Sequence, residues 1–220
     1  MLEHNPVARR LIAEALGNVV DRTVRKHVAG ITQEPALTAR IGQALENELD
    51  GRPILGYRLR IFTQDIPDRG TGSLERYIGG DLYVEVGEGA WRESKGFLVQ
   101  AKFERNLIRH SAERQALRED CEDMLDRTTA SYVWLYSDNR VRVLKAQQVR
   151  DSPEDPQSLP ARRASTLFDR TLECREGARA LGLPDVQGDE AHMRSALGTL
   201  LEGLRHPPPM AVGVSIVPSH

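Results

Sequence analysis

Cysteine is scarce in this chain, which has two cysteines in 220 residues, Cys121 and Cys174. Two cysteines this far apart do not make a disulfide framework, so we expect reduced thiols and an intracellular protein. No apolar run approaches the roughly 20 residues that a transmembrane helix needs. The first residues also lack the long uncharged stretch and the cleavage site of a signal peptide. These absences predict a soluble, cytoplasmic protein without membrane contact.

An excess of positive charge is also missing, since the formal net charge is −2. The chain as a whole therefore lacks the charge of a typical nucleic-acid binder, and any basic surface must be local. Five basic residues cluster in the predicted first helix: Arg9, Arg10, Arg22, Arg25 and Lys26. They form either an ordinary solvated helix face or a contact surface for phosphates. The sequence has no glycine-rich phosphate loop of the Walker type.

Hydrophobic residues make up 40% of the chain, which is enough for one globular domain with a sizeable core. Apolar spacing predicts helices over residues 6–28, 37–49, 107–128, 161–181 and 189–205. Alternation predicts strands over residues 56–64, 81–86 and 97–103, and a further strand pair within 131–146. Residues 151–160 contain three prolines and are predicted to be a linker, and the tail after residue 205 to be extended. This order predicts a mixed sheet with helices packed on it.

Polar residues interrupt the otherwise apolar strand at 97–103. Because side chains alternate across a strand, Gln100 and Lys102 share one face, and in the preceding strand Asp81 and Tyr83 share a face. A hairpin with its loop centred near residues 91 and 92 would pair position 81 with 102 and 83 with 100. Cross-strand partners lie about 5 Å apart at Cβ, so Asp81, Gln100 and Lys102 would converge. A surface ion pair is the simpler alternative, but the apolar flanks favour a site.

A carboxylate, an amide oxygen and a lysine on one patch suit a hard divalent cation, Mg²⁺ or Mn²⁺, together with a phosphate. The helix predicted at 37–49 offers a further carboxylate. On a helical wheel Glu48 lies within the apolar face and Glu46 lies on the opposite side. A buried carboxylate needs a partner, so we expect Glu48 to be delivered to the site.

The Gln-Ala-Lys sequence begins nineteen positions after the aspartate of Gly-Gly-Asp. This pattern resembles the PD-(D/E)XK nuclease superfamily. It resembles more closely the Mrr-like restriction endonucleases, in which glutamine replaces the acidic residue of the second half-motif. The stretch RGTGSLERYIGGD also resembles a bacterial group of small nucleases that carry RGxGS-x-E upstream of VQAK.

The resemblance implies an α/β fold with a restriction-endonuclease-like αβββαβ core, a mixed central sheet and extra N- and C-terminal helices. The core would span residues 36–150, after an N-terminal helical extension at 1–35. Beyond the linker at 151–160, residues 161–220 would form a C-terminal helical and extended region.

The resemblance also implies site roles. Asp81 would be the main metal ligand, Gln100 would take the second acidic position, and Lys102 would be the catalytic lysine. Glu48 would be the helix glutamate, and the Ala101 carbonyl would add a metal ligand. Three further candidates are Glu75, Glu46 and Tyr83.

The expected activity is Mg²⁺-dependent hydrolysis of DNA phosphodiester bonds by an endonuclease, in a prokaryotic restriction or antiviral defence setting. The expected partners are DNA and either a second copy of the chain or a partner protein of a defence system. Two alternatives stay open. The first is a catalytically weak or inactive nuclease-fold module that binds nucleic acid or a partner protein, and the second is an effector that a partner activates.

Overall fold

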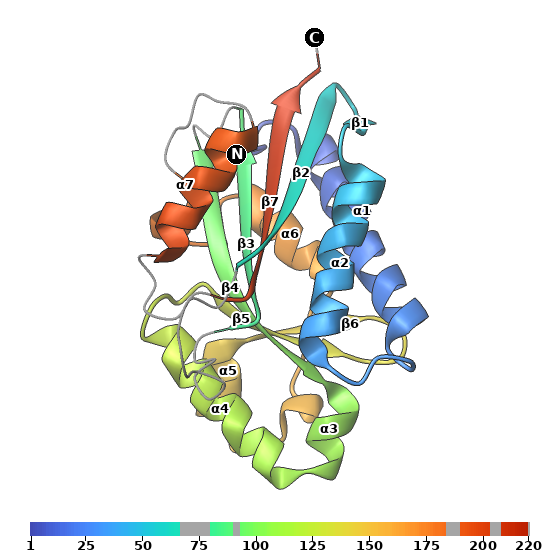
Figure 1. The fold of residues 1–220 in the computed structure, drawn as a ribbon, viewed down its shortest axis with the longest axis vertical. Coiled ribbons are helices and arrows are strands. Elements are labelled where there is room, and N and C mark those ends of the chain that lie inside the picture. Colours follow the sequence, from blue (N-terminus) through green and yellow to red (C-terminus); the bar gives the residue numbers. More distant parts are fainter. Residues whose placement is uncertain (67–79, 90–92, 184–189, 203–207, 220) are drawn as a thin grey trace.

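The computed structural model describes residues 1–66, 80–89, 93–183, 190–202 and 208–219. Within these residues a mixed sheet of seven strands runs through the molecule in the order β1-β2-β7-β3-β4-β5-β6 (Figure 1). The strands are β1 (Pro53–Ile54), β2 (Tyr57–Asp65), β3 (Leu82–Glu88), β4 (Glu93–Phe103), β5 (Ser131–Tyr136), β6 (Val141–Lys145) and β7 (Met210–Pro218). The chain therefore has an α/β fold with a mixed sheet, as the sequence predicts.

Helices flank this sheet. The α-helices are α1 (Pro6–His27), α2 (Glu34–Leu49), α3 (Glu104–Arg109), α4 (Ser111–Leu125), α5 (Ala146–Asp151), α6 (Ala164–Leu172) and α7 (Glu190–Glu202). Two short 3₁₀ helices are η1 (Pro156–Ser158) and η2 (Arg179–Leu181). In the described part of the chain, no helix combines the length and the apolar character needed to cross a bilayer.

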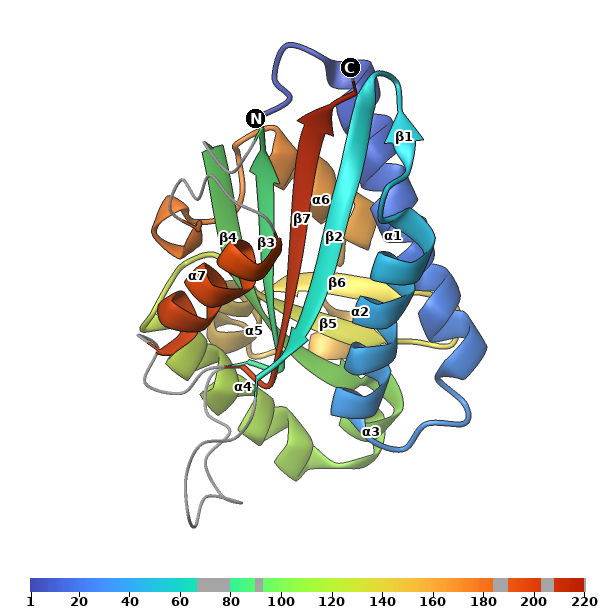
Figure 2. The same ribbon diagram turned by 45° about the horizontal axis from the view of Figure 1, so that its top comes forward.

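The helices form two layers, one on each side of the sheet (Figure 2). Helices α1, α2 and α6 pack on one face, where strands β3 and β4 contribute only apolar side chains to the core. Helices α4, α5 and α7 pack on the other face, which receives Tyr83 and Leu98 from the same two strands. The predicted alternation of both strands is thus confirmed, and Gln100 and Lys102 belong to the α4 side.

The C-terminal strand β7 lies in the middle of the sheet, between β2 and β3. It pairs antiparallel with β2 and parallel with β3. Its residues from Met210 to Ile216 are all buried, as expected for a strand covered on both faces. The extended tail predicted from the sequence is therefore a central strand of the sheet.

Two predicted helices are divided in the structure. The segment expected as one helix over 107–128 forms α3 and α4, because His110 between them has extended backbone angles. The segment expected over 161–181 contains only α6 and η2. Cys174 and Gly177 between them both have positive φ, which the right-handed helix does not accept. The turn after α6 instead brings Ala178 into a bridge with Gly96 of β4.

Candidate active site

Strands β3 and β4 form the predicted antiparallel hairpin, but with a different register. Leu82 pairs with Val99 and Tyr83 pairs with Leu98, so position 81 lies opposite position 100 rather than 102. The predicted register is wrong by two residues. A shift of two keeps every side chain on its face, and Asp81 therefore still approaches Gln100.

Gly80 sets the entry of the chain into β3. Its φ is +110°, a region that favours glycine, and a Cβ there would lie 3.1 Å from the Val99 carbonyl oxygen. The next backbone amide, that of Asp81, donates to the same Val99 carbonyl at 2.8 Å. Glycine at position 80 thus allows the close approach that holds Asp81 against β4.

The Asp81 carboxylate is bound to the motif of the neighbouring strand. Its Oδ2 accepts hydrogen bonds from Gln100 Nε2 at 2.8 Å and from the Ala101 backbone amide at 2.7 Å. Within the described residues, Asp81 Oδ1 and Gln100 Oε1 have no hydrogen-bond partner. These two oxygens are the atoms of the pair that remain able to bind a ligand.

Lys102 extends from the same face of β4 to helix α4. Its Nζ lies 3.6 Å from Asp120 Oδ2 and 3.8 Å from Glu113 Oε2. The two acidic residues are seven positions apart and therefore lie on one side of α4. The lysine is held between the hairpin and this acidic side of the helix.

The charges of this cluster act on one another. Burial raises the pKa of Asp81 to about 7, against the Ala101 hydrogen bond and the Lys102 charge, which lower it. Burial disfavours the charged form of Lys102, but Asp120, Asp81, Glu113 and Glu34 outweigh it and raise its pKa. Four carboxylates thus act on one ammonium group. The electrostatic surplus at this site is negative, which favours a bound cation.

Helix α2 contributes Glu34 to this cluster. Glu34 is the first residue of the helix, and its Oε1 accepts from the Phe103 amide at 3.1 Å and from Asn106 Nδ2 at 3.1 Å. It therefore ties the start of α2 to the end of β4, one residue after Lys102. Its charge acts on both Asp81 and Lys102.

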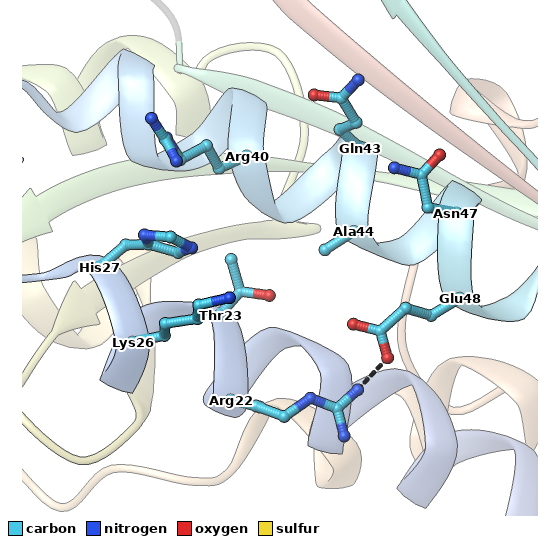
Figure 3. A pocket seen from close by; sticks show the side chains of 9 residues that line it. All are labelled: Arg22, Thr23, Lys26, His27, Arg40, Gln43, Ala44, Asn47 and Glu48. Atoms are coloured by element: carbon cyan, nitrogen blue, oxygen red, sulfur yellow. Dashed lines mark hydrogen bonds and ion pairs between the residues drawn. The ribbon is translucent and has the colours of Figure 1, made fainter.

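Glu48, the expected helix glutamate, lies elsewhere. Its carboxylate forms an ion pair with Arg22 of α1, and its side chain is 41% exposed (Figure 3). It is not among the charges that act on Asp81 or Lys102. The expectation that Glu48 joins the site is therefore corrected, and Glu34 is the α2 carboxylate that lies there.

The predicted apolar face of α2 included Ala44, which lines an open groove beside Glu48, and left out Thr38 and Gly42. The buried side of α2 includes Thr38 and Gly42, and a Cβ on Gly42 would lie 2.5 Å from Met210 Cε. The contact stripe is thus turned toward β7, away from Glu48. This rotation half-buries Glu46, whose Oε2 accepts from the Thr63 amide at 3.0 Å on β2. Glu46 therefore ties α2 to β2 and does not join the Asp81–Lys102 site.

The remaining candidates have separate outcomes. Tyr83 is fully buried on the α4 side, and its hydroxyl donates to the Leu181 carbonyl rather than to a site residue. Ala101 contributes its amide to Asp81, as described above. Glu75, and most of the RGTGSLERYIGGD stretch, lies outside the described residues.

Three residues of the cluster escaped the sequence analysis, namely Glu34, Glu113 and Asp120. A signal existed for each of them. Glu34 precedes Pro35, and proline is common in the first turn of a helix, so the α2 start was readable. Glu113 and Asp120 share one face of a predicted helix that follows the Lys102 strand directly. What the sequence does not show is that this face turns toward Lys102.

The carboxylates do not by themselves form a metal centre. Among the described residues, no three His, Cys, Asp or Glu side chains are grouped so that they could hold an ion. Comparisons with protein-family models, with curated proteins and with solved structures found no match for the chain. The functional assignment rests on the residues of the site alone.

Proposed function

We propose that the chain is a metal-dependent endonuclease with a restriction-endonuclease-like core, and that its substrate is a DNA phosphodiester bond. The observation that carries this proposal is the hydrogen bond from Gln100 to Asp81 across the hairpin, with Lys102 on the same face of β4. These are the three residues that the resemblance makes catalytic. Their convergence is what a D…QxK nuclease site requires.

The element order supports the same proposal. Helix α2, strands β2, β3 and β4, helices α3 and α4, and strand β5 follow one another as in an αβββαβ core. Strand β4 is antiparallel to β3 and parallel to β5. The sheet has three strands besides those of the proposed core: β1 and β6 at its edges and β7 inserted between β2 and β3.

The oxygen atoms of the site fit a magnesium or manganese ion. Magnesium commonly takes one or two protein carboxylates and completes its shell with water and substrate phosphate. Asp81 would supply the carboxylate, and Gln100 Oε1 and the Ala101 carbonyl would supply neutral oxygens. The raised pKa of Asp81 and the surrounding carboxylates are the electrostatic setting that a cation relieves.

A bound divalent cation would supply Lewis-acid activation of the phosphoryl group and of water. The protein residues would position the cation and neutralise negative charge on the substrate. Asp81 is fixed by two hydrogen bonds, so it needs little reorganisation to bind. Lys102 would offset negative charge that develops on the phosphoryl oxygens, and Asp120 and Glu113 would hold its ammonium group in place.

A second candidate is an inactive nuclease-fold module that binds nucleic acid or a partner protein, including an effector that a partner activates. One observation favours it. Lys102 is engaged by two carboxylates of α4, and Gln100 in the acidic position leaves Asp81 as the single carboxylate of the motif. Both features weaken a catalytic centre that acts unaided.

The two candidates are separated by cleavage of supercoiled plasmid with Mg²⁺ or Mn²⁺ and with an EDTA control. We expect nicked or linear products only with the cation. Lys102→Ala should lower the rate at least about 100-fold and leave Mn²⁺ binding intact. The Lys102 role is refuted if this variant cleaves like the parent protein. DNA retention in gel shifts without cleavage under any condition would instead support the binding module.

A further inference from the structure

A hollow of about 270 Å³ opens between helices α1 and α2 (Figure 3). We call it the α1–α2 groove. It is lined by Arg22, Thr23, Lys26 and His27 of α1 and by Arg40, Gln43, Ala44, Asn47 and Glu48 of α2. The apolar sides of both helices face the sheet core, so the groove is formed by their polar sides and has no part in the Asp81–Lys102 site.

Positive charge is in excess in the groove. Three cationic side chains, those of Arg22, Lys26 and Arg40, line the groove together with a single carboxylate, that of Glu48. Glu48 pairs with Arg22, whereas Lys26 and Arg40 have no ion-pair partner among the described residues. Burial lowers the pKa of His27, and the charges of Arg40 and Lys26 lower it further. Like charges from two helices are thus held together without enough negative charge to balance them.

The groove is built on fixed elements. The connection between α1 and α2 is held by Arg105, which donates to the Val28 and Ile31 carbonyls at 2.6 Å each. The Arg105 guanidinium in turn lies 4.2 Å from the centroid of the Phe103 ring. The backbones of the two helices that carry the cationic side chains are therefore held relative to one another before a ligand arrives, which lowers the entropic cost of binding.

We propose that the α1–α2 groove is a binding site for a phosphoryl group. A guanidinium matches phosphate oxygens with paired donors, and an ammonium adds a point charge. Arg40 and Lys26 approach from different helices, and the Gln43 and Asn47 amides line the α2 side. Donors from several directions suit a tetrahedral anion with three or four oxygens better than a planar carboxylate.

Glu48 makes the proposal sharply testable, because it competes with the anion for Arg22. Glu48→Gln should free Arg22 and tighten phosphate binding, while Lys26→Ala and Arg40→Ala should weaken it. Removal of one charge-assisted contact typically costs about tenfold in affinity. Arg58→Ala is the matched control, since Arg58 is exposed on β2 and outside the groove lining.

The experiment titrates the full chain with inorganic phosphate in one arm and with a short DNA duplex in the other. EDTA is present in both arms, so cleavage plays no part and the result is independent of the proposed nuclease activity. The His27 ring resonance reports binding locally, and calorimetry gives the affinity. Binding in the phosphate arm identifies a small phosphorylated ligand, and binding in the duplex arm alone identifies the nucleic-acid backbone.

The expected result is a His27 shift on ligand addition, about tenfold weaker binding for Lys26→Ala and Arg40→Ala, tighter binding for Glu48→Gln, and no change for Arg58→Ala. All four substitutions are at exposed positions, so the variants should fold. The proposal is overturned if neither ligand moves the His27 resonance. It is equally overturned if Arg40→Ala and Arg58→Ala have the same effect.

Discussion

The two faces of the β3–β4 hairpin differ in the polar and charged side chains that they bury. On the side of α1, α2 and α6, the fully buried side chains of both strands are apolar, and the half-buried Lys95 of β4 donates to the Cys174 carbonyl. On the side of α4, α5 and α7, the same strands present Asp81, Glu85, Gln100 and Lys102. Burying polar and charged groups is costly unless they are paired. Under the proposed function, this face would carry the chemistry and the other would carry stability.

Asp81→Asn should give the largest effect of any substitution on the polar face. It removes the only carboxylate of the proposed ligand set, while an amide oxygen can still accept from the Ala101 amide. Loss of a supporting group around a metal costs about 10- to 100-fold, so loss of the ligand itself should cost at least about 100-fold in plasmid cleavage. Asp151→Asn, at an exposed position of α5, is the control for the same chemical change. Cleavage by Asp81→Asn at the parent rate would contradict the proposal that the polar face of the hairpin carries the nuclease site.

Glu85 gives the second effect, on stability. It is fully buried on β3, and its oxygens make no hydrogen bond of good geometry within the described residues, although the Ser94 side chain and the Leu183 backbone lie close to them. Burial raises its pKa well above the usual value, against these two groups, which lower it. A carboxyl group whose pKa is raised by folding costs nothing below the unfolded pKa, and it reduces stability as the pH rises above that value. Glu85→Gln should therefore stabilise the protein by roughly 1–3 kcal/mol at pH 8, and the difference should vanish near pH 4.

Urea unfolding at the two pH values measures this difference. Glu88→Gln is the control, since Glu88 lies at the partly exposed end of the same strand and should change stability by less than about 0.5 kcal/mol. Equal stability of Glu85→Gln and the parent at pH 8 would show that Glu85 has a partner in solution. Burial of the Glu85 carboxylate would then not reduce the stability of the protein.

Phe97→Leu tests the apolar face. The Phe97 ring packs edge-on against Tyr132, with 5.5 Å between centroids, and lies 6.3 Å from Phe168. Replacement by leucine should cost about 1 kcal/mol through the lost aromatic contacts. Cleavage per folded molecule should stay unchanged, because no site residue touches this ring. A loss of cleavage without a loss of stability would show that the two faces are coupled.

The sequence predicted the strands better than the helices, and the reason is geometric. Strand alternation has a period of two, so the face of Gln100 followed directly from its neighbours. The register was missed by two residues, because the pairing depends on the turn rather than on the alternation. The wheel of α2 failed at Gly42 and Thr38, which are small or polar yet lie in the contact stripe. Thr38 Oγ1, for example, lies 2.7 Å from the Tyr136 hydroxyl.

Non-local contacts were out of reach for the sequence. The tail Met210–Pro218 could be predicted to be extended, but its place between β2 and β3 depends on pairing across more than 120 residues. The Lys102 contacts with α4 likewise depend on how that helix is turned against β4. Asp81, Gln100 and Lys102 were predictable because they belong to one hairpin, whose two strands are neighbours both in the sequence and in the sheet. Glu34, Glu113 and Asp120 were not, because they come from helices whose packing the sequence does not show.

Glu34→Gln should have the smallest effect on cation binding and cleavage, and it tests whether Glu34 belongs to the site. Glutamine keeps an oxygen that can accept from the Phe103 amide, so the tie between α2 and β4 survives while the charge is lost. Through a partly screened medium such a charge change should alter Mn²⁺ affinity or cleavage only about threefold. Glu14→Gln, at an exposed position of α1, is the matched control. A loss of 100-fold or more would mean that Glu34 binds the cation itself, and no change at all would remove it from the site. Only an intermediate loss agrees with a carboxylate that acts on Asp81 and Lys102 through its charge.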